Sequence, residues 1–429
     1  MDKDGVKVLS LFDGMACGML AMQGAGIKVT RYVAYEIDKY AVQTSAHNFP
    51  MIEHRGDVFA ADFTEFYGFD VLVGGSPCTY WSIAQKNNRE TEASGMGWEL
   101  FCQYVRALHE AKPRFFVYEN NKSMSNAIRE SITKAFGFEP ICINSALVSA
   151  QNRNRLYWVG KREADGTYSK VHIEQPKDRG IMLRDVIGLD LTSNSGRPAN
   201  VTTGPCKVGE IGNGGQGNRI YSVCGKSVAQ TATSGGIGSN TGLYAIPVAV
   251  ESSTVLKAIP EIERKCGYVP EMFNAYNRAE ITDKAPTLST GSMVTSSCAV
   301  NRFENISAWA VPVEWDADGK PTRAVSGADG KAYPVYEVKD GFITIKDKVY
   351  PIKLADGFYI IRKLTVNECK RLQTVPERYE FPVSDTQAYK MLGNGWTVQV
   401  IVHLLAACVN PAETTDILFC DSNGNYRFF

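Results

Sequence analysis

Residues 6–19 read VKVLSLFDGMACGM, and this stretch decides the fold class. The apolar run Val6–Phe12 predicts a buried strand, and Gly14 and Gly18 follow it where the pattern becomes helical. A glycine-containing turn at the carboxyl end of a first strand lets a ligand approach the backbone, as nucleotides do in open α/β sheets. The stretch therefore predicts the first strand and helix of an α/β domain, with a ligand site at the sheet edge.

The first 160 residues continue this alternation of short apolar runs and helical patterns. Further strands are expected at Val29–Glu36, Asp70–Gly74, Phe115–Glu119 and Arg155–Val159. Helices are expected at Asp38–His47, Trp98–Ala111 and Ser125–Phe136. Strands that alternate with helices of this length are typical of βαβ units, so a mostly parallel sheet is predicted.

The overall composition is that of a neutral globular protein of two or three domains, with 429 residues. Its 46 Lys and Arg balance 46 Asp and Glu, which argues against coating nucleic acid by charge alone but allows a local basic face. The eleven cysteines form no Cys-x-x-Cys pair, and neither a signal-like start nor an apolar run of about 18 residues occurs. A reducing, cytoplasmic location is expected, with no membrane span and no metal site.

The character of the chain changes after Gly160. Eleven glycines lie in the 39 residues from Gly204 to Gly242, a density typical of loops with unusual backbone angles or close approaches. Between Arg197 and Val250, four basic residues stand against one acidic residue, a net charge of +3. This is the clearest local basic bias in a neutral chain.

Helical patterns return towards the C-terminus. A helix is expected over Thr365–Gln373, because Thr365 and Glu368 have the spacing of a capping box, and an apolar helix is expected over Thr397–Cys408. The division that follows is an α/β domain in residues 1–175, a loop-rich insert in residues 176–360 and a return of the first domain in residues 361–429.

Acidic residues follow the first three strand candidates in order. Glu36 ends the second strand about 20 residues after the glycine turn, where a carboxylate can accept hydrogen bonds from both ribose hydroxyls. Asp57, in GDVF, follows a further short strand candidate that precedes Asp70–Gly74, as Asp13 follows the first strand. Each alone also fits a solvated carboxylate at a strand end. Three in succession favour an adenosine site.

The strand Asp70–Gly74 runs directly into GGSPCTYWS, residues 74–82. Cys78 lies at the carboxyl end of that strand behind Pro77, as an exposed nucleophile would, whereas a buried packing cysteine is the alternative. The next strand ends in FFVYENN, which brings Glu119 beside Cys78 if the two strands are neighbours. A nucleophile needs an acid or base within reach, and Glu119 is the predicted partner.

Two arginines alternate in QNRNR, residues 151–155. In an extended segment Arg153 and Arg155 point to one face. They are candidates to hold Glu119, a substrate base or a phosphate, and an exposed basic strand is the alternative.

These blocks, in this order, resemble the DNA (cytosine-5)-methyltransferases. The resemblance rests on LFDGMACG, Glu36, GDV, GGSPC, ENN and QNRNR, followed by LTVNECKRLQTVPERY and MLGNGWTVQV. It covers residues 6–160 and 364–409. The variants DGMACG and Gly-Asn-Gly-Trp are closer to the mammalian de novo branch and its prokaryotic or phage relatives, and the lack of histone-reading or zinc-binding extensions indicates a stand-alone bacterial or phage enzyme.

The resemblance implies a Rossmann-like catalytic domain that binds S-adenosylmethionine without a metal, and an insert that serves as the target recognition domain. The residues it assigns to the cofactor are Phe12, Asp13, Gly14, Met15, Ala16, Cys17, Glu36, Ile37, Asp57, Val58, Asn394 and Trp396. The implied partner is duplex DNA, with a cognate restriction endonuclease as a second expected partner. Candidate DNA contacts are Ser82, Arg219, Lys226, Arg278 and Thr287.

It also implies a chemical route. Carbon 5 of cytosine is a poor nucleophile, so the Cys78 thiolate would add to carbon 6 while Glu119 hydrogen-bonds ring nitrogen 3 and the amino group. Arg153 and Arg155 would steady the base and a neighbouring phosphate. The target atom is inaccessible in a duplex, so the cytosine would flip out at a cost of a few kcal/mol, with residues 82–97 as a closing loop.

Two residues depart from the family pattern: Thr79 stands where many relatives have Gln or Asn, and Asn121 stands where Val is usual. They put loop contacts and the packing beneath the site in doubt. Two other functions stay open, a tRNA cytosine-5 methyltransferase and a catalytically inactive DNA-binding homologue. The long basic insert favours DNA over tRNA, and the intact Pro-Cys and Glu-Asn pairs favour an active enzyme.

Overall fold

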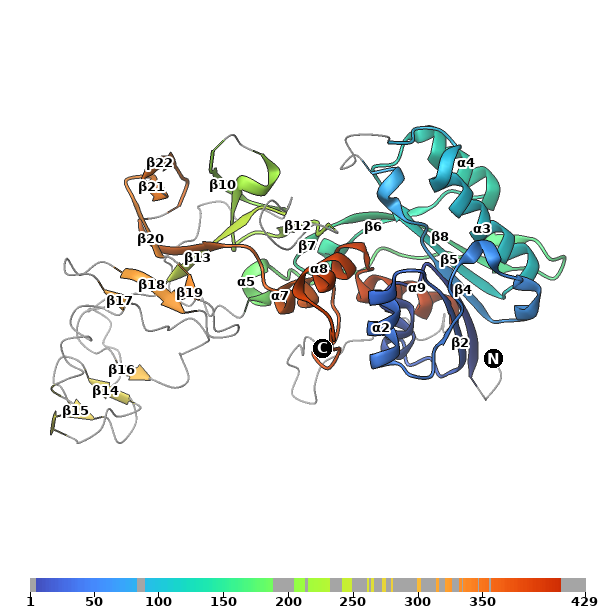
Figure 1. Cartoon of the computed structure of the whole chain (residues 1–429), viewed down its shortest axis with the longest axis horizontal. Helices are drawn as coiled ribbons and strands as arrows, with labels where there is room; N and C mark the ends of the chain where they lie inside the picture. The colour runs from blue at the N-terminus through green and yellow to red at the C-terminus, as the bar shows by residue number, and fades with distance from the viewer. Residues whose placement is uncertain are drawn as a thin grey trace.

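The structure, a computed structural model, describes residues 5–82, 89–187, 204–212, 215–231, 241–248, 335–345, 347–354 and 356–409, with short segments between 261 and 333. The part built from the N-terminal residues and the part built from the insert lie side by side (Figure 1). Helices α7 (Val366–Leu372) and α8 (Asp385–Asn394) lie between them in this view. The C-terminal segment thus contacts the region where the two parts meet.

The main sheet has the strand order β3-β2-β1-β4-β5-β8-β6, with β9 paired to β8. Its first five strands are parallel, as predicted, whereas β8 runs antiparallel to both β5 and β6. The antiparallel step places the start of β8 beside the carboxyl end of β5. The bounds are β1 Val6–Leu11, β2 Val29–Tyr35, β3 Glu53–His54, β4 Val71–Gly74, β5 Phe115–Asn121, β6 Ile141–Asn144, β8 Asn154–Arg162 and β9 Tyr168–Lys170.

Helices cover both faces of this sheet because successive strand residues point to opposite sides. Val8 packs in a core with residues of α1 and α9, and Leu9 packs in a second core with residues of α3 and α4. Each expected helix of the catalytic part is present within a few residues. The bounds are α1 Cys17–Gly24, α2 Lys39–Asn48, α3 Gly95–Ala111, α4 Asn126–Phe136, α5 Leu183–Val186 and α9 Val398–Val409.

The predicted capping box begins α7. The Thr365 backbone N–H donates to the Glu368 carboxylate at 2.7 Å, and the Glu368 N–H donates to the Thr365 hydroxyl at 3.3 Å. Glu368 also forms a buried ion pair with Arg362, with 2.7 Å between Nη2 and Oε1. The residue that caps the helix therefore also fixes the last strand before it.

The insert was predicted to be rich in loops, but it also contains a second sheet. The sheet order is β10-β11-β13-β23-β20-β21-β22, and its apolar side chains form a separate core. Some glycines serve this sheet: a Cβ at Gly242, where φ is +77°, would lie 2.6 Å from the Tyr221 ring. The bounds are β10 Lys207–Glu210, β11 Arg219–Ser222, β13 Leu243–Val248, β20 Val335–Lys339, β21 Phe342–Ile345, β22 Lys348–Pro351 and β23 Gly357–Arg362.

Shorter strands complete the described elements. They are β7 Gln151–Asn152, β12 Ser227–Val228, β14 Met272–Asn274, β15 Ala279–Glu280, β16 Ala299–Asn301, β17 Glu314–Trp315, β18 Pro321–Val325 and β19 Ala332–Tyr333. The pairing of β7 with β12 joins the insert to the catalytic part. The proposed boundary at residues 360 and 361 falls inside β23, so this strand belongs with the insert sheet.

Lys226 fastens the insert to the catalytic part. Its side chain is buried, and its ammonium donates to the main-chain carbonyls of Ala146 at 2.8 Å, Ser149 at 3.1 Å and Ile181. A buried ammonium is tolerated when carbonyl oxygens replace its water shell. The structure does not place Lys226 where DNA could reach it, so its assignment as a DNA contact is corrected to a structural role.

The stretch Asp385–Cys408 has the length and apolar composition of a membrane span, but 67% of its most apolar window is buried inside the protein. It consists of α8 and α9, which are separate helices. Burial against α1 explains its apolar character, because the side chains of α9 belong to one core with those of α1.

Candidate active site

A cavity of about 240 Å³ lies at the carboxyl edge of the main sheet. Phe12, Gly14 and Glu36, predicted for the cofactor, line it together with Cys78 and Glu119, predicted for the base. These residues follow β1, β2 and β4 or end β5, and parallel strands present their carboxyl ends at the same edge. The two predicted half-sites therefore share one cavity.

Cys78 begins a short 3-10 turn immediately after Pro77 and is partly exposed. The backbone N–H groups of Trp81 and Ser82 donate to the Cys78 carbonyl at 3.1 and 2.9 Å. The glycine before the turn is required by a close approach, since a Cβ at Gly75 would lie 2.8 Å from the Glu119 carbonyl oxygen and 2.9 Å from its Oε2. The Gly-Gly-Ser-Pro-Cys segment thus packs against Glu119, and Cys78 and Glu119 line the same cavity.

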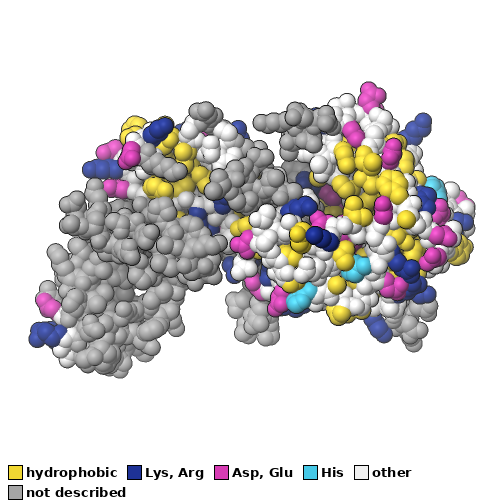
Figure 2. All heavy atoms as spheres, viewed as in Figure 1, with side chains coloured by type: hydrophobic (Ala, Val, Ile, Leu, Met, Phe, Trp, Pro, Cys, Tyr) yellow, Lys and Arg dark blue, Asp and Glu magenta, His cyan; other side chains and the backbone are white. Residues whose placement is uncertain are grey.

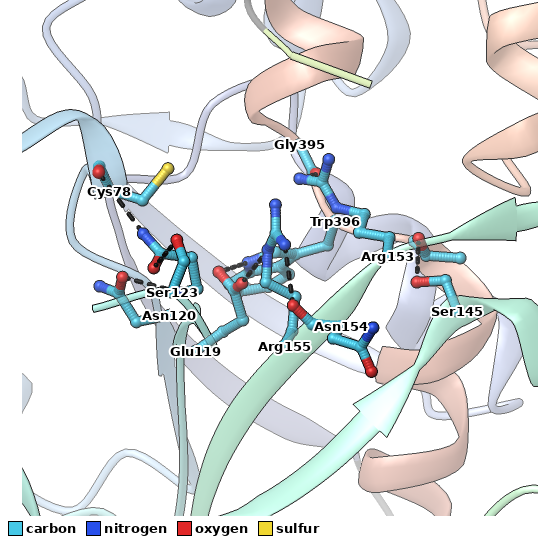
Figure 3. A network of polar contacts seen from close by, with 12 residues as sticks. Cys78, Glu119, Asn120, Ser123, Ser145, Arg153, Asn154, Arg155, Gly395 and Trp396 are labelled. Carbon is cyan, nitrogen blue, oxygen red and sulfur yellow. Dashed lines mark hydrogen bonds and ion pairs between the residues drawn. The ribbon is translucent and has the colours of Figure 1, made fainter. Parts of the chain in front are cut away.

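Glu119 is 9% exposed, and both of its carboxylate oxygens have partners. The Arg155 Nε lies 3.0 Å from Oε1, and the Trp396 indole Nε1–H donates to Oε2 at 3.0 Å. Figure 3 shows the three side chains together, with Cys78 on the neighbouring segment. Arg155 reaches Glu119 because β8 pairs with β5 so that Arg155 stands opposite Asn121. The predicted partnership of Arg155 and Glu119 is present.

The asparagines after Glu119 fix the cysteine loop, a role that the sequence analysis did not assign. The Asn120 amide donates to the Ser76 carbonyl at 3.1 Å, and the Ser76 and Tyr118 hydroxyls are 2.7 Å apart. The Asn121 amide nitrogen lies 3.5 Å from the Cys78 carbonyl. The asparagine that departs from the family pattern therefore supports the cysteine turn directly.

Arg153 lines the same cavity as Arg155 but makes different contacts. It is 3% exposed, and its guanidinium donates to the carbonyls of Gln230 at 2.8 Å, Gly393 at 3.0 Å and Gly395 at 2.9 Å. Burial lowers the pKa of Arg153 to about 10, so the group remains charged at neutral pH. Arg153 thereby joins the insert to the C-terminal segment, and its expected contact with the base and a phosphate stays a prediction.

Glu36 organises the opposite end of the cavity. Its carboxylate accepts hydrogen bonds of 2.8 Å from the backbone N–H groups of Gly14, Ile37 and Asp38. Gly14 has φ of +57°, and a Cβ built there would meet nothing within 4 Å, so the glycine turn opens onto free space. Lys390 forms a 2.6 Å ion pair with Asp38 at this rim, which no motif indicated.

Asp13 is buried at 8% exposure beneath the glycine turn. Its Oδ1 accepts from the Ser10 and Tyr32 hydroxyls at 2.6 Å each, while Oδ2 has no hydrogen-bond partner among the described residues. Burial raises the pKa of Asp13 from an ordinary 3.8 to about 6, with a smaller contribution from the charge of Glu36. The folded protein therefore binds this proton more tightly than the unfolded chain does, which stabilises the fold at low pH. This stabilisation is lost as pH rises through about 6.

We predict that Asp13→Asn removes part of the pH dependence of stability. One pKa unit corresponds to about 1.4 kcal/mol, so ionising Asp13 in the folded protein costs roughly 3 kcal/mol. The free energy of unfolding of the wild type relative to Asp13→Asn should fall by roughly this amount between about pH 4 and pH 7. Urea unfolding of both proteins at the two pH values measures it. Equal pH dependence in the two proteins would contradict the burial of this carboxyl.

The profile of the family described as C-5 cytosine-specific DNA methylase matches residues 6–198 and 258–410, well over half of the chain. The chain belongs to this family. The resemblance read from the motifs is thereby confirmed.

Relatives extend the comparison. The orphan methyltransferase M.SPRI of Bacillus phage SPR is 35% identical over 170 residues, 37% of this chain and 38% of the phage protein. The type II methyltransferase M.HhaI of Haemophilus parahaemolyticus is 25% identical over 264 residues, 56% of this chain and 79% of that protein. The chain thus spans well under half the length of the phage relative.

A solved structure supports the fold class. The Entamoeba histolytica methyltransferase EhMeth superposes with a TM-score of 0.52 at 12% identity, over 95% of this chain and 99% of that one. At this identity the likeness shows the fold alone. The predicted Rossmann-like methyltransferase fold is confirmed.

The cavity contains most of the residues that the resemblance assigned to the cofactor. Those lining it are Phe12, Asp13, Gly14, Met15, Cys17, Glu36, Asn394 and Trp396. Four others are not in its lining: Ala16 and Val58 are buried, Ile37 is 76% exposed, and the Asp57 carboxylate caps a turn by accepting from the Phe59 N–H at 3.0 Å. The carboxylate of Glu36, the buried oxygen of Asp13 and the open space at Gly14 fit a nucleoside with a cationic amino-acid end.

The candidate DNA contacts divide into three groups. Ser82 ends the turn that begins at Cys78, where its N–H donates to the Cys78 carbonyl, and Arg219 is exposed on β11. Arg278 and Thr287 lie outside the described residues, as do residues 83–88 of the expected closing loop. Lys226, as shown above, is buried.

The basic bias of the insert does not become a basic surface in the described part of the chain. Lys207 pairs with Glu210, and Lys226 is buried, which leaves Arg219 exposed. On the face of the catalytic part seen in Figure 2, Lys and Arg side chains are interspersed with Asp and Glu. Positive and negative side chains are therefore mixed on this face, as they are in the chain as a whole.

Proposed function

We propose that this protein transfers a methyl group from S-adenosylmethionine to carbon 5 of cytosine in duplex DNA. The proposal rests on one observation: Cys78 and Glu119 line the same cavity as Glu36. Family membership supports methyl transfer to cytosine. The covalent route and the duplex substrate are what the family resemblance implies, and the shared cavity of Cys78 and Glu119 supports the route.

The cysteine and the carboxylate would perform the addition together. The Cys78 sulfur forms a bond to carbon 6 of the cytosine, and the displaced electron pair makes carbon 5 an enamine carbon. Glu119, once protonated, donates a hydrogen bond to ring nitrogen 3 and accepts one from the amino group, which stabilises the negative charge that develops on the ring. Arg155, 3.0 Å from the Glu119 carboxylate, keeps that group oriented.

The bound cofactor would supply the electrophilic methyl group to carbon 5. A base then removes the carbon 5 proton, the bond between sulfur and carbon 6 breaks, and the Cys78 thiolate is restored. Glu36, the Gly14 turn and the Asn394–Trp396 segment would hold the adenosine and amino-acid ends of the cofactor. Within one turnover, the bond between the Cys78 sulfur and carbon 6 is thus formed once and broken once.

The cavity lies at the sheet edge between Pro77 and Trp396. Cys78 lies inside this cavity, so the cytosine would have to leave the helix stack before Cys78 could reach carbon 6. Unstacking costs a few kcal/mol, which contacts from the insert would offset. We accordingly propose that the insert, residues 176–360, is the target recognition domain, with Ser82 and Arg219 among the DNA contacts.

The competing substrate is tRNA, which a related branch of the family methylates. Parallel assays with labelled S-adenosylmethionine on duplex DNA and on tRNA separate the two substrates. We expect incorporation into DNA, and incorporation into tRNA alone would refute the proposal. An inactive homologue would label neither substrate, although it would still bind DNA.

Bisulfite sequencing of DNA from bacterial cells that express the protein adds the sequence context. We expect protected cytosines at one recurring motif. The relatives M.SPRI and M.HhaI come from a phage and a bacterium, which agrees with a cytoplasmic enzyme acting on intracellular DNA. If the methylated motif is also cut by a nuclease of the same host, the protein acts with a cognate restriction endonuclease.

A further inference from the structure

We infer that Trp396 is a positioning residue for Glu119, in addition to lining the cofactor end of the cavity. Its indole Nε1–H donates to Glu119 Oε2 at 3.0 Å, while Arg155 holds Oε1 from the other side (Figure 3). The inference rests on the proposed function, because it concerns the carboxylate that would bind the target cytosine. It assigns to the C-terminal segment a direct role at the base end of the site.

The backbone around Trp396 is fixed on several sides. The Gly395 carbonyl accepts from the buried Arg153 guanidinium at 2.9 Å, and the Gly395 N–H donates to the Met391 carbonyl at 2.7 Å. The Cys17 thiol lies 3.9 Å from the Trp396 carbonyl oxygen. A Cβ at Gly395 would lie 3.0 Å from the Met391 oxygen, so glycine is needed for this close approach. The indole therefore extends from a rigid support.

The contact determines how the carboxylate is held. Glu119 is nearly buried, and Gly75 packs against its side chain so closely that a methyl group would not fit. With Oε1 bound to Arg155 and Oε2 bound to Trp396, the carboxylate plane is set by two donors from different parts of the chain. Without the indole N–H, one oxygen loses its donor and the group can rotate about its last torsion angle.

This arrangement makes Trp396 the link between the two ends of the cavity. Its backbone belongs to the segment that would hold the cofactor, and its side chain reaches the carboxylate that would hold the base. Pre-organised hydrogen bonds of this kind act on the transition state more than on substrate binding. Loss of the indole N–H should therefore lower kcat and leave KM for DNA nearly unchanged.

The first test replaces Trp396 by phenylalanine and, by site-specific incorporation, by benzothienylalanine, which keeps the bicyclic shape but has sulfur in place of the N–H. We expect both variants to lower kcat for duplex DNA by about 10-fold or more, the usual effect of removing a hydrogen bond to a charged group. Cofactor affinity, measured by calorimetry, should change by less than about 3-fold for benzothienylalanine. Full activity of the benzothienylalanine protein would overturn the inference.

Trp158→Phe is the matched control. Trp158 is buried on the face of the sheet that α3 and α4 cover, and it does not line the cavity. Its indole N–H donates to the Thr133 hydroxyl at 3.3 Å. This variant also loses an indole N–H inside the protein, so it shows the general effect of that loss on stability. We expect its kcat to remain within about 2-fold of the wild type.

A double-mutant cycle with Glu119→Gln separates positioning from general structure. In Glu119→Gln the amide oxygen would face Arg155, which leaves the amide NH₂ opposite the indole N–H. Trp396→Phe should then have no further effect on kcat, because the bond it removes is already absent. If the fold-losses in kcat of the two single variants multiply in the double variant, the two side chains act independently and the inference is overturned.

An NMR measurement tests the contact without relying on activity. The chain has six tryptophans, so six indole N–H signals are expected, and Trp396→Phe identifies the one that belongs to Trp396. We expect Glu119→Gln to shift this signal more than the other five, and an unmoved signal would overturn the inference. If the wild type methylates neither DNA nor tRNA, the proposed function fails, while the NMR result still reports on the contact.

Discussion

Replacing Cys78 by alanine is expected to lower the rate of methyl transfer by more than about 1,000-fold, because the proposed reaction depends on covalent addition of its sulfur. The structure places Cys78 in the lining of the cavity that Glu119 also borders and leaves it partly exposed. Single-turnover incorporation of labelled methyl into duplex DNA measures the loss. The variant should also fail to form a covalent complex with DNA that carries 5-fluorocytosine, a base that blocks the release of the enzyme.

Folding and DNA binding should survive this substitution. The Cys78 backbone supplies the contacts that hold the turn, through its carbonyl and the N–H groups of Trp81 and Ser82. Its side chain supplies little buried area. A melting temperature within about 2 °C of the wild type would confirm that activity is lost through chemistry.

Two other cysteines serve as controls for Cys78. Cys102 is exposed on α3 and Cys142 is partly buried on β6, and neither lines the cavity. Their alanine variants should retain wild-type methylation. If Cys78→Ala methylated DNA at a comparable rate, or if Cys102→Ala were the inactive variant, the nucleophile would be misassigned.

Sequence reasoning located the site because its residues lie at strand ends. Glu36, Cys78 and Glu119 each follow or end a strand of one parallel sheet, and such ends converge whatever the loops between them do. The capping box at Thr365 was likewise readable because it involves residues three positions apart. Local patterns and the geometry of parallel sheets were sufficient for these features.

Long-range contacts were not predictable in the same way. The Trp396 side chain meets Glu119 across 277 residues of sequence, and no periodic pattern relates the two positions. The contacts of basic residues were equally unpredictable. Lys226 was expected to contact DNA, and Arg153 to hold Glu119, a base or a phosphate, yet each donates to carbonyl oxygens in the interior. Net charge along a segment therefore does not determine which cations face solvent.

The different fates of Arg153 and Arg155 lead to the second large expected effect. Replacing Arg153 by methionine should lower the free energy of unfolding by roughly 3–5 kcal/mol, the usual effect of removing one side of a buried charged network. The carbonyls of Gln230, Gly393 and Gly395 would each lose a donor while remaining buried. Thermal unfolding followed by circular dichroism or calorimetry measures the loss.

The same variant should weaken cofactor binding without changing the electrostatics of DNA binding. Arg153 supports the backbone of Gly395, next to Trp396, so the segment proposed to hold the cofactor would loosen. Arg153→Lys should recover only part of the stability, because one ammonium lacks the planar fork that reaches carbonyls on two sides.

Arg219→Met is the matched comparison, since Arg219 is exposed on β11 and Arg153 is buried. If Arg219 contacts a phosphate, its loss should reduce the slope of log affinity against log salt by about 0.9 and leave stability unchanged. Arg153→Met should do the reverse, provided the protein is assayed below its melting temperature. A reduced salt slope for Arg153→Met, with unaltered stability, would restore the sequence-based role of Arg153 at a phosphate and refute its assignment as an internal support.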